Sequence, residues 1–137
     1  MSKYIDKAKI LRSKFTEEGR PVYNCAQAVL CPFADVIGLD ETVLYKMATH
    51  FGGGMKMASV CGAITGGLMA LGLLGADDMK SLQIYYGKIR AEHDGLMNCA
   101  DLLRVNAEKG GEKMAHCNAM IYECVGYVEE IAGLAEH

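Results

Sequence analysis

The chain has 137 residues, a formal net charge of −3, a hydrophobic content of 51% and 23% charged residues. A chain of this length can bury roughly two-thirds of its unfolded surface, so we expect residues 1–137 to form a single domain that needs no disulfide. The acidic balance excludes the basic field that would hold nucleic acid, and the composition excludes a disordered chain.

The first expected helix covers residues 3–18. One face of it carries the apolar side chains Tyr4, Ile5, Ala8, Leu11 and Phe15. This spacing is typical of an amphipathic helix, which Gly19-Arg20-Pro21 would end. Asn24 is expected to cap a second helix that Pro32 bends or ends, and Asp40 is expected to cap a short third helix.

The middle of the chain is apolar and rich in glycine. Residues 57–76 contain no charged side chain, which is a stretch long enough to cross a bilayer. Gly62 and Gly66 have the spacing that lets two helices approach closely. Because the segment is weakly apolar and has no aromatic or basic anchors at its ends, we interpret residues 60–74 as a buried central helix, preceded by a loop at residues 51–54.

Further helix caps follow along the chain. Ser59 is expected to cap the central helix, Asp77 the next helix and Asn98 the one after it. The helix after Asp77 is expected to point these side chains inward: Leu82, Tyr85, Tyr86 and Ile89. Gly110-Gly111 separates the helix after Asn98 from the last one.

The last helix has the clearest pattern in the sequence. Its inward positions recur at spacings of three and four residues: Met114, Cys117, Ile121, Cys124, Val128, Ile131 and Ala135. This is a seam of about three heptads. Since no stretch alternates like a strand, the sequence predicts an all-α fold, a compact multi-helix domain around the buried glycine-rich helix.

The six cysteines point to redox or metal chemistry. The start of the chain lacks a secretory signal, so we expect a cytoplasmic protein, in which thiols stay reduced. Cys25, Cys61 and Cys99 lie at expected helix starts, where the helix dipole lowers the pKa of a thiol. Cys124 is the fourth candidate.

The cysteine spacings exclude a local disulfide. Cys117 and Cys124 lie about 10 Å apart along a helix axis, whereas a disulfide needs Cα atoms within roughly 7 Å. Cys25 and Cys31, six residues apart, fail in the same way. Any disulfide or metal site must therefore join cysteines from different helices.

Several of these segments together resemble a known family, the C_GCAxxG_C_C family of redox-active proteins. The resemblance runs from about residue 20 to 134 and depends on Asn24-Cys25-Ala26-Gln27-Ala28-Val29, Phe51-Gly52-Gly53-Gly54-Met55, Cys61-Gly62-Ala63-Ile64-Thr65-Gly66, Cys99 and Cys124.

The resemblance implies roles for the cysteines. Cys25, Cys61 and Cys99 fall on the signature positions. Cys124 is taken as the fourth because Cys124-Val125-Gly126-Tyr127-Val128 is similar to the family's final Cys-x-x-x-Val, and Cys117 is the competing choice. The family implies an all-helical domain with redox use of its cysteines. Related domains carry an iron–sulfur centre, and members are often encoded near transporter genes.

Two redox hypotheses remain open. In the first, Cys25 or Cys61 is the attacking thiolate and Cys99 or Cys124 the resolving thiol. In the second, the same four sulfurs bind an iron–sulfur cluster or metal. Gly62 next to Cys61, together with Gly66, could leave room for a bound group.

Other functions stay as alternatives. Nine methionines and the glycine-rich helix could form the surface of a protein-interaction module, for example one associated with a transporter, in which the cysteines are structural. The same sulfurs could hold a structural zinc ion. A homo-oligomer could form through the glycine spacing, and His50 could line the site. The redox partner and any enzymatic reaction stay open.

Overall fold

The computed structural model describes residues 2–134. Within that range the chain forms eight α-helices, two short irregular helical segments and no strand, which confirms the all-α prediction. The elements are α1 (Lys3–Arg12), α2 (Cys25–Leu30), η1 (Cys31–Phe33), α3 (Ala34–Ile37), α4 (Glu41–Met47), η2 (Gly54–Ala58), α5 (Gly62–Leu73), α6 (Met79–Glu92), α7 (Cys99–Glu108) and α8 (Lys113–Ile131).

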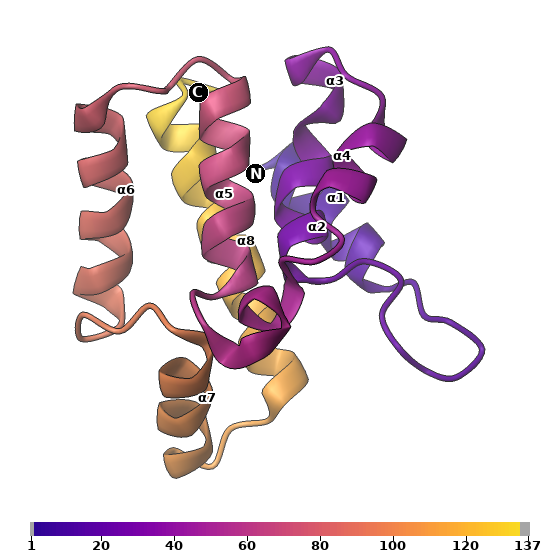
Figure 1. The fold of residues 1–137 in the computed structure, drawn as a ribbon, viewed down its shortest axis with the longest axis vertical. Helices are drawn as coiled ribbons and strands as arrows, with labels where there is room; N and C mark the ends of the chain where they lie inside the picture. Colours follow the sequence, from indigo (N-terminus) through magenta and orange to yellow (C-terminus); the bar gives the residue numbers. More distant parts are fainter. Residues whose placement is uncertain (1, 135–137) are drawn as a thin grey trace.

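The long C-terminal helix α8 joins the two sides of the molecule. It packs against α1, α2, α5, α6 and α7 (Figure 1). The glycine-rich helix α5 packs against α2 and α8, and its other side stays open to solvent at Gly72 and Leu73. Within the described residues, no helix is both long and apolar enough to cross a membrane.

Two glycines of α5 allow it to touch α2. A Cβ atom on Gly66 would lie 2.6 Å from the carbonyl oxygen of Ala26, and one on Gly62 would lie 2.8 Å from that of Phe51. Side chains at these positions would force the backbones apart. The glycine spacing therefore serves a close helix contact, as the sequence indicates.

The helix starts follow the predicted caps at α2, α4 and α7, although Asn98 of α7 makes no side-chain capping hydrogen bond, and they differ at α5 and α6. The side-chain oxygen of Asn24 accepts a hydrogen bond from the backbone N–H of Gln27, and Asp40 accepts one from Thr42. Helix α6 is capped by Asp78 rather than Asp77, and α5 has Cys61, not Ser59, at its N-cap.

Helix α1 ends at Arg12, six residues earlier than expected. Tyr4, Ala8 and Leu11 are buried as predicted, but Phe15 lies beyond the helix and is 51% exposed. A turn replaces the helix there, because the N–H of Thr16 donates to the carbonyl oxygen of Arg20 at 2.7 Å.

The predicted seam of α8 faces the core in its second half. Ile121, Cys124 and Val128 are fully buried. Met114 and Cys117, one or two turns earlier, are only half-buried. The first half of the seam therefore points toward a cavity rather than into the core. Ala135, the last residue of the predicted seam, lies outside the described residues.

Candidate functional site

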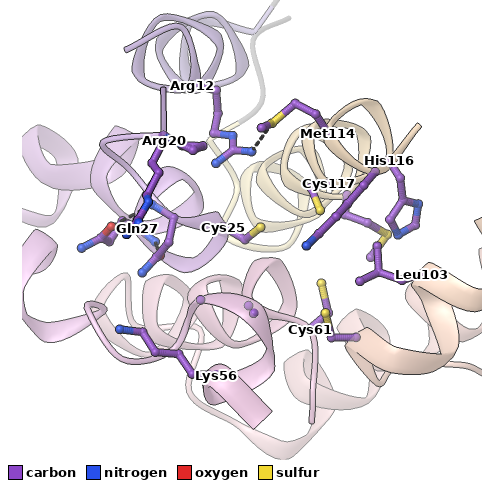
Figure 2. Close-up of a pocket in the computed structure, with 18 of the residues that line it drawn as sticks. Arg12, Arg20, Cys25, Gln27, Lys56, Cys61, Leu103, Met114, His116 and Cys117 are labelled. Carbon is purple, nitrogen blue, oxygen red and sulfur yellow. Dashed lines mark hydrogen bonds between the residues drawn. The ribbon is translucent and has the colours of Figure 1, made fainter. Parts of the chain in front are cut away.

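A pocket of about 950 Å³ collects four of the six cysteines. Its wall contains Cys25 from α2, Cys61 from the start of α5, Cys99 from α7 and Cys117 from α8. Figure 2 shows the sulfur atoms of Cys25, Cys61 and Cys117 facing the same space. Thiols far apart in the sequence therefore meet between helices, as the spacing argument requires.

A capping box fixes Cys25 at the first position of α2. The side chains of Asn24 and Gln27 each accept a hydrogen bond from the other's backbone N–H, both at 2.8 Å. The amide groups of both side chains also donate to the end of α4: Asn24 to the carbonyl oxygens of Ala48 and Thr49, and Gln27 to that of Tyr45. The start of α2 is therefore held at several points.

Glycines bring the start of α5 against Cys25. A Cβ atom on Gly62 would lie 3.3 Å from the Cβ of Cys25, and one on Gly52 would lie 2.6 Å from the Cβ of Asn24. Gly62 also lines the pocket, whereas Gly66 packs on α2 outside it. Of the two glycines predicted to leave room for a ligand, only Gly62 borders the pocket.

A short antiparallel bridge holds Cys61 and Cys99 together. Val60 and Asn98 pair, and each is followed directly by a cysteine. The N–H of Cys61 donates to the carbonyl oxygen of Met97 at 2.9 Å, and that of Cys99 donates to Ser59 at 2.6 Å. Two helix starts, each with a thiol, are thereby placed side by side.

Cys117 lies in the second turn of α8 beside a buried arginine. Arg12 is 6% exposed. Its guanidinium donates to the side-chain oxygen of Asn118 at 2.7 Å, to the carbonyl oxygen of Tyr23 at 2.8 Å and to the sulfur of Met114 at 3.0 Å. All three acceptors are neutral, so they satisfy its hydrogen bonds without cancelling its charge.

The sulfur atoms of Cys25 and Cys117 face each other in the pocket (Figure 2) and shift each other's pKa in opposite directions. The neighbouring Cys25, Arg12 and Lys113 together lower the pKa of Cys117 from 9.0 to about 6, against the effect of burial. Cys117 and burial raise the pKa of Cys25. The pair is therefore a thiolate at Cys117 and a thiol at Cys25 near neutral pH.

Cys61 and Cys99 are held as thiols. Burial raises the pKa of Cys61 to about 11, although the backbone N–H groups of Ala63 and Ile64 point at its sulfur and act in the opposite direction. Burial, with the neighbouring Cys117, raises the pKa of Cys99. This differs from the sequence-based expectation that a helix start activates these thiols, because burial outweighs the helix start.

The other two cysteines lie outside the pocket wall. Cys124 is fully buried in the core, where its thiol contacts the hydroxyl of Tyr85 and burial raises its pKa. Cys31 is also fully buried, and burial raises its pKa to about 12. Among the competing choices for the fourth site cysteine, the pocket contains Cys117 rather than Cys124.

The comparison with known families agrees with this gathering of thiols. A family model described as "Putative redox-active protein (C_GCAxxG_C_C)" matches residues 23–131, a range that contains all six cysteines. The chain belongs to the C_GCAxxG_C_C family. No curated protein and no solved structure matches the chain.

The pocket thiols of this C_GCAxxG_C_C protein are the type of donor that an iron–sulfur cluster binds. Within residues 2–134, no three His, Cys, Asp or Glu side chains lie close enough to hold one metal ion. We therefore derive no step through a zinc ion or a cluster.

Sequence reasoning missed the cations of the site. Arg12, Arg20, Lys56 and Lys113 line the pocket, and none of them follows a recognisable motif. His116 also lines it, and burial lowers its pKa, so it is neutral near pH 7; His50 does not line it. The only sequence signal for Cys117 is the seam of α8, which places it on the same helix face as Met114; both residues line the pocket.

Proposed function

We propose that this C_GCAxxG_C_C protein carries out thiol–disulfide exchange, with Cys117 as the attacking thiolate and Cys25 as the resolving thiol. The observation that carries the proposal is the placement of these two sulfurs, which face each other in one pocket beside the charge of Arg12 (Figure 2). A thiolate is the nucleophile in such exchange, and the best attacking thiol has a pKa near the ambient pH. Cys117 is the pocket cysteine that meets this condition.

The first step consumes one external disulfide. The Cys117 thiolate attacks one sulfur of the substrate, forms a mixed disulfide and expels the other half as a thiolate. The Cys25 thiol then loses its proton to that leaving thiolate or to water, attacks the Cys117 sulfur and releases the second half. The protein has lost two electrons and holds a Cys25–Cys117 disulfide, and the substrate has become two thiols.

The position of Cys25 favours the second step. Its sulfur already faces that of Cys117 across the pocket (Figure 2), so the two sulfurs are neighbours before reaction. Forming an S–S bond of about 2.05 Å requires only that they close the remaining gap. Cys61 and Cys99 remain protonated at neutral pH and compete poorly for the first attack.

Peptide mapping of the oxidised protein tests the proposal. The reduced chain is exposed to one equivalent of a neutral disulfide, quenched with acid and mapped by mass spectrometry. We expect a Cys25–Cys117 disulfide in the wild type. Cys25→Ser should stop at a mixed disulfide on Cys117, and Cys117→Ser should lose the rapid reaction.

Cys31→Ala is the matched control, because Cys31 is buried outside the pocket wall. It should react at the wild-type rate. Rapid oxidation that persists in Cys117→Ser, or a wild-type disulfide that maps to Cys61 and Cys99, would contradict the proposal.

A further inference from the structure

We propose that the substrate of this pocket is a small organic disulfide that carries carboxylates on both halves. The cations on the wall hold these carboxylates while the disulfide bond lies against Cys117. The inference rests on the proposed exchange function and adds to it the chemical class of the substrate.

The pocket has a charge opposite to that of the whole chain. Four cationic side chains and one carboxylate, Glu112, line it, a formal net charge of +3, or +2 with the Cys117 thiolate, whereas the chain carries −3. A pocket of one sign concentrates ligands of the opposite sign and speeds their association. The excess of positive charge is confined to the pocket, so it does not reflect the overall composition of the chain.

Three of the four cations, Arg20, Lys56 and Lys113, are also free to bind an anion. Within residues 2–134 the ion pairs involve other side chains, and no carboxylate lies within 4.0 Å of the charged nitrogens of Arg12, Arg20, Lys56 or Lys113. Arg12 is buried with neutral acceptors only. A buried cation normally has an anionic partner, and here the Cys117 thiolate supplies it.

The remaining cations lie around the thiols in two groups. Lys113, the first residue of α8, lies on the pocket wall with Cys99 and Cys117; its charge helps to lower the pKa of Cys117 and opposes the rise that burial causes at Cys99. Arg20 and Lys56 lie on the other side, around Gln27 and beyond Cys25 as seen from Cys117 (Figure 2). A disulfide bound at Cys117 can therefore extend one half toward each group.

The size of the pocket favours an organic disulfide over a small inorganic ion. Its volume of about 950 Å³ is near the upper end of ligand pockets, which span roughly 300–1,000 Å³. Apolar side chains, among them Val22, Leu102, Leu103 and Met120, line it together with the cations. Carbon arms of a substrate would pack on these side chains while its carboxylates reach the cations.

The charge preference can be measured with a matched set of disulfides. Reduced full-length protein is reacted in single turnover with 3,3′-dithiodipropionate, with its neutral diamide and with cationic cystamine; oxidised glutathione is a larger anionic probe. Each rate is divided by the rate of the same disulfide with a free low-molecular-weight thiol, which removes differences in leaving-group chemistry.

We expect the dicarboxylate to react faster than its diamide and cystamine to react slowest. One charge pair about 4 Å apart in water corresponds to roughly a fivefold effect, so two pairs give up to about thirtyfold. The preference should shrink toward unity in about 1 M salt, where the screening length falls to about 3 Å.

Charge-removing variants locate the effect. Arg20→Gln and Lys56→Gln should each lower the dicarboxylate-to-diamide ratio several-fold. Lys80→Gln removes the same charge from the exposed face of α6, outside the pocket, and should leave the ratio unchanged. Arg20 and Lys56 are both exposed, so we expect these two variants to fold like the wild type.

The outcomes separate this inference from the function on which it rests. If all the disulfides oxidise Cys25 and Cys117 at the same normalised rate, the substrate class is refuted and the exchange function stands. If the ratio falls equally in Lys80→Gln, the pocket cations are not responsible and the inference is refuted. If no disulfide oxidises this pair, the proposed function fails first.

Discussion

Replacing Gly66 with alanine tests the contact between α2 and α5, the two helices that position Cys25 and Cys61. An alanine Cβ would lie 2.6 Å from the carbonyl oxygen of Ala26, whereas ordinary contact begins at 3.4 Å, so the two atoms must separate by 0.8 Å. Both partners are parts of packed helices, so the helices themselves must move. Overpacking of this kind costs roughly 1–3 kcal/mol, and the gain in helix propensity from Gly to Ala returns about 1 kcal/mol.

Gly72 in the same helix provides the matched control. A Cβ there meets nothing within 4 Å, and its backbone is not in the left-handed region. Gly72→Ala should therefore gain about 0.5–1 kcal/mol from propensity alone. After the same gain is subtracted, we expect Gly66→Ala to lose up to about 2 kcal/mol, so the overpacking cost places the two variants about 1–3 kcal/mol apart.

Urea unfolding followed by far-UV circular dichroism measures this difference. With a slope of roughly 1–3 kcal/mol per molar urea, the midpoints of the two alanine variants should differ by roughly 1 M. Gly66→Ala should also slow the oxidation of Cys25, because α2 moves away from α5. If Gly66→Ala is as stable as Gly72→Ala, α2 and α5 do not touch as described, and the reasoning about the site scaffold is refuted.

Three further predictions concern the cysteines themselves. Because the thiolate is the reactive form, alkylation of Cys117 by iodoacetamide should rise with pH through about 6 and then level off. In Cys25→Ala, which lacks the neighbouring thiol, the rise should move to higher pH, and an unchanged profile would show that Cys25 does not act on Cys117. Treatment with an iron chelator should leave the exchange rate unchanged and release no stoichiometric iron or sulfide, whereas loss of activity would revive the cluster. Cys124→Ala should cost about 1 kcal/mol of stability through a small core cavity and leave the exchange rate intact, and a lost rate would place Cys124 in the site.

The helix starts that sequence could identify are those whose signal is local. Asn24 and Gln27 lie three residues apart and form reciprocal hydrogen bonds, so their spacing in the sequence is enough to predict the start of α2. The end of α1 has no such signal. The apolar stripe continues through Phe15, but the turn between Thr16 and Arg20 and the bridge between Phe15 and Pro21 take that segment out of the helix.

Of the site residues, only those with a signal in the neighbouring sequence could be predicted. Cys25, Cys61 and Cys99 were found because each lies at or beside a helix start. Cys117 lies inside α8, and it reaches the pocket because α8 packs against α1 and α2. The charge of Arg12 is likewise brought to it by tertiary packing. Burial raises the pKa of Cys61 and Cys99. It depends on the folded structure, so the spacing of cysteines in the sequence cannot predict it.

The buried charge of Arg12 has a consequence for the redox balance of the pair. In the reduced protein the Cys117 thiolate is stabilised by Arg12, Lys113 and the Cys25 thiol. In the disulfide that negative charge is gone, and Arg12 is left buried with only neutral acceptors. A reduced form stabilised in this way makes the disulfide a stronger oxidant. We therefore infer that the Cys25–Cys117 disulfide is reduced readily, and equilibration with a glutathione redox buffer measures it: a potential as low as that of a structural disulfide would show that Arg12 does not act on the pair.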